Sequence, residues 1–407
     1  MKTRQVGVVL GLFLIVLPLT QRSLCAQTTL VRADRVMTSS AEGIVGPRFI
    51  LVEGGKIVSV TATRPSGLPE STPLLDAAFV APGFIDARTT LGLSGLHPGD
   101  DDRDETSGPN QAHLRAIDAF DPSDPTVRHA LRTGVTTIQT GPGDANSIGG
   151  QAGIFKLSAA TVNHAVVRFP SAVVFSLDES AKLTYGTARR YPSTRMANVG
   201  LIRQALVDAN RYRTELEGDK APTRDLKKEA LAMVLAGDVP ALVSAERADE
   251  LATALRLAEE FGIDLMIVGG TDAQVVLDRL AESGVTVLLG PAGDAAFRPD
   301  GVQRSIGTAA KLRERGIPFA LVTGDDANAS RSSLFELARL AARGGLTLEE
   351  ALEAVTISPA RILELDEVMG SIEAGKDADL VLFDGDPLTA TTQFLAVLVD
   401  GVVIHNR

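Results

Sequence analysis

Cysteine and histidine are both scarce in this sequence. Cys25 is the single cysteine, and 407 residues contain five histidines. These are His97, His113, His129, His164 and His405. A catalytic zinc ion typically takes about three protein ligands, most of them imidazoles. Because no histidine lies between residues 165 and 404, a standard pair of zinc ions has too few candidate ligands.

Positive charge is also in short supply. Lysine and arginine number 40 against 51 aspartates and glutamates, which gives a formal net charge of −11. Nucleic-acid binding needs a basic surface that neutralises phosphates, so this balance argues against DNA or RNA as a partner. No heptad pattern is sustained, which argues against a coiled coil. A composition of 44% hydrophobic and 22% charged residues is that of an ordinary globular chain.

The N-terminus carries an apolar stretch with charged and small residues around it. Lys2 and Arg4 precede the apolar residues 6–19, and the small residue Ala26 follows. This order is typical of a secretory signal peptide, and about fourteen apolar positions are too few to span a bilayer comfortably. We expect cleavage after Ala26, which removes Cys25; an N-terminal membrane anchor is the alternative. The expected location is periplasmic or secreted, with no stable membrane insertion after cleavage.

Short strand patterns occupy both ends of the remaining chain. Residues 49–52 and 57–60 flank a Glu-Gly-Gly-Lys turn and read as a hairpin. Residues 380–404 repeat this style, with an Asp-Gly turn before the last strand pattern. Two strand-rich ends around a different middle predict one small β domain, assembled from residues 27–80 and 368–407.

Strand and helix patterns alternate through the middle of the chain. A stripe of apolar residues predicts a helix over residues 248–261, and an unbroken apolar run predicts a buried strand at 265–268. Further helices are expected over residues 273–280 and 306–315, and further strands at 285–289 and 319–322. Thr347 and Glu350 form a capping box that opens another helix. About eight such units fit in residues 81–367, which predicts a barrel with a parallel sheet.

Three segments carry a resemblance to a known family. Residues 81–87 read Ala-Pro-Gly-Phe-Ile-Asp-Ala, a strand entry with a rigid turn. With residues 344–360 and 370–381, they resemble the first barrel strand, the last helices and the final β-sandwich of the amidohydrolase superfamily. The imidazolonepropionase-like branch is the most similar. The resemblance implies a (β/α)8 barrel of the TIM type, a small β-sandwich from both chain ends, and metal-dependent hydrolysis of non-peptide carbon–nitrogen bonds. The expected division is a signal peptide at residues 1–26, a composite sandwich at 27–80 and 368–407, and a barrel at 81–367.

The resemblance also shows which positions hold the metal ligands in that superfamily. In this sequence, most of those positions carry residues that bind metal ions poorly. The superfamily's first-strand histidines correspond to Arg88 and Thr90, and its strand-five and strand-six histidines correspond to Ser244 and Gly269. Only the acid of strand eight is retained, as Asp325. A permanent cation such as Arg88 would repel a metal ion. We therefore expect no metal ligands and no cofactor, although zinc is what the family resemblance implies.

Four side chains are the candidate site residues. Asp325 is the candidate catalytic acid or base; the alternative is a carboxylate paired with Arg88 across the barrel mouth. Arg88, Glu179 and Glu246 are the candidates for binding a substrate; the alternative for Glu179 is a solvated loop carboxylate, which is the more common state of such a residue. The acidic run at residues 100–105 follows the first barrel strand, and we expect a solvated loop there.

Two hypotheses for the function follow from these residues. The first is a divergent amidohydrolase that uses an unusual carboxylate site or a metal-free site. The second is a non-catalytic pseudoenzyme that binds a small ligand or a partner chain at the barrel mouth. A small-molecule ligand and a homo- or hetero-oligomer are compatible with both. Metal analysis of the purified protein is the simplest measurement that distinguishes the two hypotheses.

Overall fold

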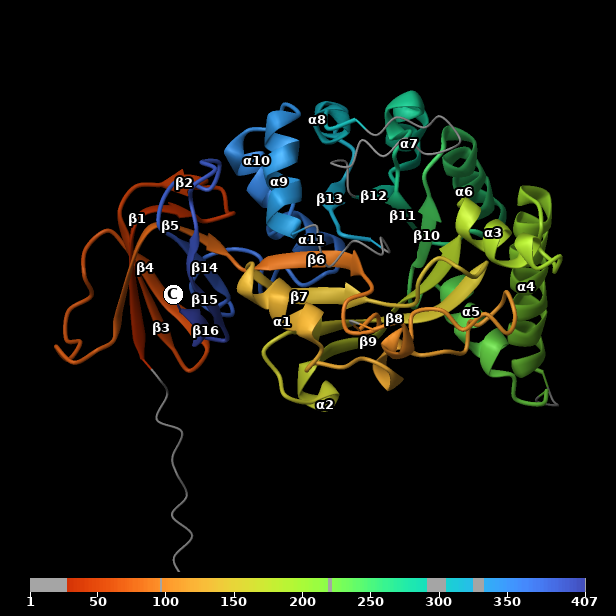
Figure 1. The fold of residues 1–407 in the computed structure, drawn as a ribbon, viewed down its shortest axis with the longest axis horizontal. Coiled ribbons are helices and arrows are strands. Elements are labelled where there is room, and N and C mark those ends of the chain that lie inside the picture. The colour runs from red at the N-terminus through yellow and green to blue at the C-terminus, as the bar shows by residue number, and fades with distance from the viewer. Residues whose placement is uncertain (1–27, 96, 219–221, 291–304, 325–332, 407) are drawn as a thin grey trace, which may run out of the picture.

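A computed structural model describes residues 28–95, 97–218, 222–290, 305–324 and 333–406. Two sheets organise the chain, one at each side of Figure 1. The first sheet combines strands from both chain ends, and the second combines the strands between them. Among the helices in this described part, none is both long and apolar enough to cross a membrane.

The first sheet brings the two ends of the chain together. Its strands are β1 (Thr29–Met37), β2 (Ile44–Val45), β3 (Arg48–Glu53), β4 (Lys56–Thr61), β5 (Leu74–Pro82), β14 (Leu380–Phe383), β15 (Phe394–Val399) and β16 (Val402–Asn406). They run in the order β16-β15-β14-β5-β1-β3-β4, with β2 beside β1. The predicted hairpin is confirmed as the antiparallel pair β3 and β4. The C-terminal strands join the N-terminal ones where β14 pairs antiparallel with β5.

The second sheet is the expected eight-stranded barrel. Its strands are β6 (Phe84–Thr89), β7 (Val135–Thr140), β8 (Ile148–Lys156), β9 (Val166–Ser176), β10 (Ala241–Ala245), β11 (Leu265–Gly269), β12 (Thr286–Leu289) and β13 (Phe319–Leu321). They are neighbours in chain order. A parallel bridge between Thr89 and Gly324 brings the last strand back to the first and nearly closes the barrel. Side chains such as Ile85, Leu242 and Leu288 fill the interior as a packed core.

One strand departs from the expected parallel arrangement. β8 runs antiparallel to both β7 and β9. Only residues 141–147 connect β7 to β8. A parallel crossover needs about a dozen or more residues, so a link this short forces the chain to turn back.

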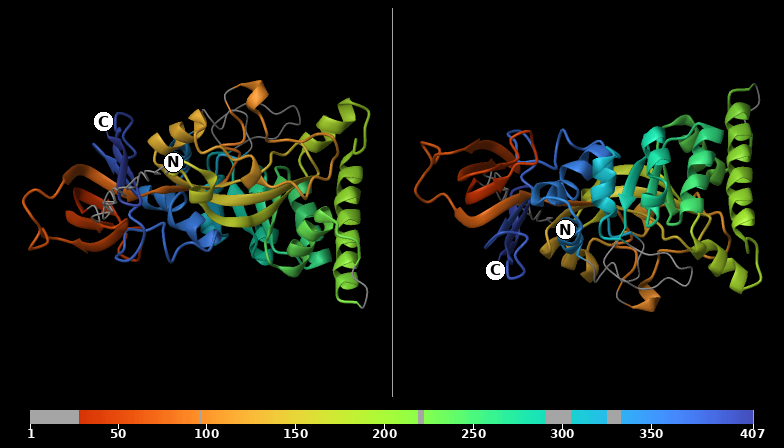
Figure 2. Two further views of the ribbon diagram at one scale, coloured as in Figure 1. Left: turned by 90° about the horizontal axis from the view of Figure 1, so that it is seen from below. Right: turned by 90° about the horizontal axis from the view of Figure 1, so that it is seen from above.

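Helices cover the outside of the barrel (Figures 1 and 2). They are α1 (Pro125–Arg132), α2 (Val162–Ala165), α3 (Glu179–Thr187), α4 (Arg195–Leu216), α5 (Leu226–Ala236), α6 (Ala248–Phe261), α7 (Leu277–Ser283), α8 (Thr308–Glu314), α9 (Leu334–Arg343), α10 (Leu348–Glu353) and α11 (Ile357–Ile362). α6 has the predicted bounds, and Thr347 and Glu350 form the predicted capping box of α10. The helix predicted over residues 273–280 is instead a 3-10 turn, Ala273–Val275, followed by α7.

Candidate functional site

A buried ion pair lies at the carboxyl ends of the barrel strands. Arg88 is near the end of β6 and has no exposed surface, and Asp144 follows β7. Nη2 of Arg88 lies 3.3 Å from Oδ1 of Asp144. The Ser244 hydroxyl, on β10, donates to the same carboxylate oxygen at 2.6 Å. Residues far apart in the sequence thus converge at the end of the barrel where such folds place their sites.

Backbone carbonyls satisfy most of the remaining guanidinium donors of Arg88. Nη1 donates to the carbonyls of Thr89 and Gly141, and Nη2 donates to that of Pro142 at 2.7 Å. A buried charge is tolerated when it is paired and hydrogen-bonded in this way. Arg88 therefore fixes the loop after β7, and with it the position of Asp144.

A second buried carboxyl, Asp178, lies between β9 and α3. It accepts hydrogen bonds from the Ser176 hydroxyl and from the Ser180 N–H, both at 2.8 Å. Burial, together with the charges of Asp144 and Glu246, raises the pKa of Asp178 to about 8. At neutral pH, Asp178 therefore holds a proton.

Glu246, which follows β10, fills the space above Gly269 at the end of β11. Its carboxylate accepts hydrogen bonds from the N–H of Thr271, at 3.0 Å, and from the Thr271 hydroxyl. A Cβ atom added to Gly269 would lie 2.6 Å from Cδ of Glu246, and Gly269 has a φ of +95°. No side chain fits at position 269 while Glu246 keeps this place.

Two further acidic residues near the mouth have raised pKa values. Burial raises the pKa of Asp104 to about 6, with the charge of Asp144 adding to the effect. The expectation of a wholly solvated loop at residues 100–105 is therefore wrong for Asp104, whose carboxylate accepts from the Ala145 N–H at 3.1 Å. Burial also raises the pKa of Asp86 to about 7. Asp86 accepts from the N–H and the hydroxyl of Thr323, so it ties β6 to the end of β13.

The predicted site residues separate into three groups. Arg88 and Glu246 lie at the barrel mouth, in the neighbourhood of Asp178 and Asp144. Glu179 is half-buried, and its carboxylate pairs with Lys182 at 2.9 Å and with Arg195 at 2.8 Å. Asp325 lies outside the described residues, so its catalytic role and its pairing with Arg88 stay predictions. The carboxylate that Arg88 meets in the described part is that of Asp144.

Sequence reasoning missed Asp144 and Asp178. Neither belongs to a recognisable sequence motif. Asp144 lies in the short loop after β7, and Asp178 lies in the short loop after β9. A usable signal was their position: acidic residues directly after strands that end at the same edge of a parallel sheet lie close together. Their distance of 34 residues in the sequence hid this proximity.

The donor set at the mouth does not fit a zinc centre. Within the described ranges, no group of three or more His, Cys, Asp or Glu side chains is arranged to hold a metal ion. The side chains of Asp144, Asp178, Ser244 and Glu246 offer only oxygen donors, whereas zinc sites favour imidazole and thiolate. The guanidinium of Arg88 lies 3.3 Å from Oδ1 of Asp144, and its positive charge opposes a metal ion at that oxygen. Zinc content itself stays a prediction.

Comparison with known proteins gives a family match and a full-length structural match. The model of the "Amidohydrolase family" matches residues 225–405. The crystal structure of an amidohydrolase from Thermotoga maritima MSB8 superposes with a TM-score of 0.87 at 32% sequence identity. That match covers 93% of this chain and 100% of the other.

Two curated relatives match over parts of their length. The amidohydrolase tasK of Hapsidospora irregularis is 27% identical over 389 residues, which cover 86% of this chain and 39% of that protein. An imidazolonepropionase of Shouchella clausii (strain KSM-K16) is 38% identical over 122 residues, 29% of this chain and 26% of that protein. The chain thus spans less than half of either relative. With the matching barrel and the full-length structural similarity, these comparisons show that the chain belongs to the amidohydrolase family.

Proposed function

We propose that this family member hydrolyses a non-peptide carbon–nitrogen bond with a pair of carboxyl groups at the barrel mouth, without a pair of zinc ions. One observation carries the proposal: the carboxylate of Asp144 pairs with the Arg88 guanidinium near a second buried carboxyl, Asp178, whose pKa is raised to about 8. Pairs of titratable groups held in this way are typical of acid–base sites.

The two carboxyls have complementary roles in this proposal. The Asp144 carboxylate takes a proton from a water molecule as that water attacks the carbonyl carbon of the substrate. Protonated Asp178 gives its proton to the departing nitrogen as the carbon–nitrogen bond breaks. The products are a carboxylic acid, which ionises in water, and an amine. Asp144 then loses its proton to solvent and Asp178 takes one up, which restores both groups. General acid–base catalysis of this kind contributes about 10²–10⁴-fold to a rate.

Other mouth residues support the pair in the proposed mechanism. Arg88 pairs with the Asp144 carboxylate, and the Ser244 hydroxyl donates to the same carboxylate oxygen. Glu246 and Glu179 remain the proposed substrate-binding carboxylates, and Asp325 remains a proposed second acid or base. The short matches to imidazolonepropionases make cyclic amides the first substrates to test, followed by acylated amino acids.

A second candidate function is ligand binding without catalysis. It is favoured by Glu246, whose carboxylate occupies the volume above Gly269, a position where the family resemblance implies a metal-binding histidine. A barrel mouth rebuilt around carboxylates and a guanidinium suits recognition of a small polar molecule as well as its hydrolysis.

The test combines turnover, metal analysis and two isosteric variants. Wild-type protein, Asp144→Asn and Asp178→Asn are assayed on cyclic amides and N-acyl amino acids, before and after a chelator. We expect turnover that survives chelation, zinc well under one equivalent per chain, and a loss of at least about 100-fold in each variant. Turnover should fall as the pH rises through about 8, because Asp178 then loses its proton.

Each contrary result has a defined meaning. Stoichiometric zinc together with loss of turnover on chelation overturns the carboxylate mechanism. Saturable binding of the same compounds with no turnover supports the pseudoenzyme. Unchanged turnover in both Asn variants removes Asp144 and Asp178 from the mechanism, and Asp325→Asn then becomes the next variant to assay.

A further inference from the structure

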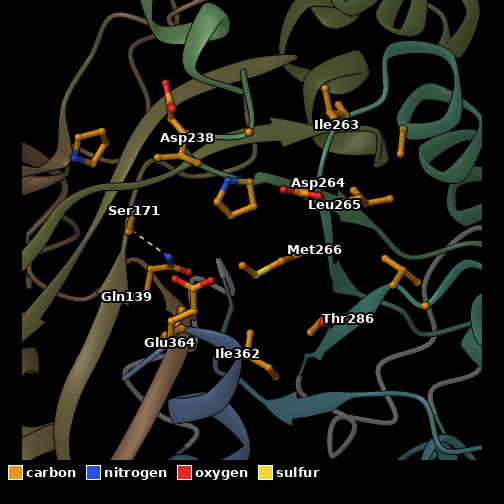
Figure 3. Close-up of a pocket in the computed structure, with 18 of the residues that line it drawn as sticks. Gln139, Ser171, Asp238, Ile263, Asp264, Leu265, Met266, Thr286, Ile362 and Glu364 are labelled. Atoms are coloured by element: carbon orange, nitrogen blue, oxygen red, sulfur yellow. Dashed lines mark hydrogen bonds between the residues drawn. The ribbon is translucent and has the colours of Figure 1, made fainter. Parts of the chain in front are cut away.

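A separate cavity of about 600 Å³ opens at the opposite end of the barrel. It is bounded by the residues that precede or begin β10, β11 and β12, and by the end of α11. The mouth cluster lies at the carboxyl ends of these same strands. Figure 3 shows the labelled side chains arranged around this space. Its size is within the roughly 300–1,000 Å³ typical of small-molecule pockets.

The floor of the cavity contains an incompletely satisfied amide. Gln139, on β7, is 1% exposed, and its Nε2 donates to the Ser171 hydroxyl at 2.9 Å. Figure 3 shows this bond and the Gln139 side chain at the edge of the space. Its Oε1 is buried and has no hydrogen-bond partner among the described residues. Buried carbonyl oxygens are nearly always paired, so a water molecule or the donor group of a bound molecule would complete the hydrogen bonding of this atom.

The walls and the rim differ in character. Apolar side chains, including Val239, Leu265, Met266 and Ile362, form the walls. The rim carries the carboxylates of Asp238, Glu259, Asp264 and Glu364, all of which are exposed residues.

Arg168 is the basic residue among those that line the cavity. Its guanidinium donates to the carbonyls of Leu363 and Glu364 and lies 3.7 Å from the Glu364 carboxylate. Glu259, another rim residue, lies 3.9 Å from the guanidinium of Arg279. Four carboxylates against two guanidiniums still give the rim a net negative charge, which attracts a cation and repels an anion.

We propose that this cavity is a second binding site, for a short amphipathic amine. The ammonium group of such a molecule lies at the acidic rim, its carbon chain lies against the apolar walls, and a hydroxyl or amide N–H at its other end donates to Oε1 of Gln139. This arrangement satisfies the floor oxygen, the walls and the rim together, whereas a pure hydrocarbon matches the walls alone and the acidic rim repels a carboxylate.

Three linear probes on the full chain separate these contributions. The probes are 5-amino-1-pentanol, pentylamine, which lacks the hydroxyl, and 5-hydroxypentanoate, which carries a negative charge in place of the ammonium. Isothermal titration calorimetry gives their affinities. We expect the amino alcohol to bind about three- to tenfold more tightly than pentylamine, the effect of one net hydrogen bond, and the anion to bind weakest.

Two variants locate the binding. Gln139→Leu should abolish the preference for the amino alcohol over pentylamine, because the acceptor is gone. The double variant Asp264→Asn with Glu364→Gln changes exposed rim residues and should weaken both amines by a similar factor. Asp144→Asn, at the opposite end of the barrel, should leave amine binding unchanged whether or not the proposed hydrolysis is correct.

The proposal is overturned if neither amine binds, if the anion binds as tightly as the amines, or if Gln139→Leu keeps the preference while remaining folded by circular dichroism. If Gln139→Leu does not fold, the rim variant decides. Unchanged amine affinity in that variant places the binding elsewhere.

Discussion

A guanidinium without exposed surface has to find its counter-charge and its hydrogen bonds inside the protein. Arg88 finds them in Asp144, in the backbone carbonyl of Thr89 at the end of β6, and in two carbonyls of the loop after β7. This single side chain therefore links barrel stability to the placement of the proposed base. It also explains how a position that the family resemblance assigns to a metal ligand can hold a cation instead.

The Arg88–Asp144 pair gives a prediction at the residue scale. Arg88→Met leaves a buried carboxylate without its cation and should destabilise the fold by about 3–5 kcal/mol. Adding Asp144→Asn should recover part of that loss; the carbonyls that have lost their donors prevent full recovery. Urea unfolding of the wild type, both single variants and the double variant measures the coupling. A coupling under about 1 kcal/mol would show that the contact is unimportant.

Asp178 gives a prediction about pH. The folded protein keeps the Asp178 proton up to about pH 8, whereas the unfolded chain releases it near pH 4. The contribution of Asp178 to stability is thus fully present below about pH 4 and is lost as the pH rises through 8. Asp178→Asn should gain stability relative to the wild type across this range, by at most about 1.4 kcal/mol per pH unit.

Matched controls isolate this effect. Asn can accept the same bonds from Ser176 and Ser180, so the helix cap of α3 is retained. The control is Asp118→Asn, the same substitution at an exposed residue. A stability difference between the wild type and Asp178→Asn that does not change with pH would contradict the raised pKa.

At the scale of elements, the end of β11 is shaped by the side chain that follows β10. Gly269→Ala should destabilise the protein by about 1–3 kcal/mol through overpacking against Glu246, in addition to the strain of its positive φ. Gly262→Ala is the matched control, because Gly262 has a φ of +63° and nothing within 4 Å of an added Cβ. Thermal unfolding should show the larger loss at Gly269, and Glu246→Ala should remove the excess. Equal losses at both glycines would refute the clash.

The sequence predicts elements well where local pattern and local chemistry agree. α6 has its predicted bounds because an apolar stripe runs up to the left-handed Gly262. The reversal of β8 was missed because strand direction depends on the length of the connecting loop and not on the strand's own residues. The mouth residues Asp144 and Asp178 were missed for a related reason: barrel closure brings them together, and no local motif marks them.

At the scale of the whole molecule, a charge cluster fastens the barrel to the first sheet. Lys156, at the end of β8, contacts Asp377 at 2.7 Å, Asp379 at 3.4 Å and Asp400 more closely still. These aspartates belong to the C-terminal segment that completes the first sheet. Burial raises the pKa of Asp379 to about 6, and the charge of Lys156 opposes that rise. One barrel side chain thus contacts three carboxylates of the C-terminal segment, and Lys56 contributes a second cation at Asp377.

Removing this cation should produce a pH-dependent loss of stability. In Lys156→Met the pKa of Asp379 rises further, so the folded variant binds protons that the unfolded chain does not. The variant should lose up to about 3–5 kcal/mol at pH 8, and less at pH 5, where protonation relieves the unpaired carboxylates. Lys311→Met, which removes an exposed ammonium bonded to Gln274, should cost under about 1 kcal/mol at both pH values. If urea unfolding gives Lys156→Met the same loss at pH 5 and pH 8, then apolar packing and not charge holds the two sheets together.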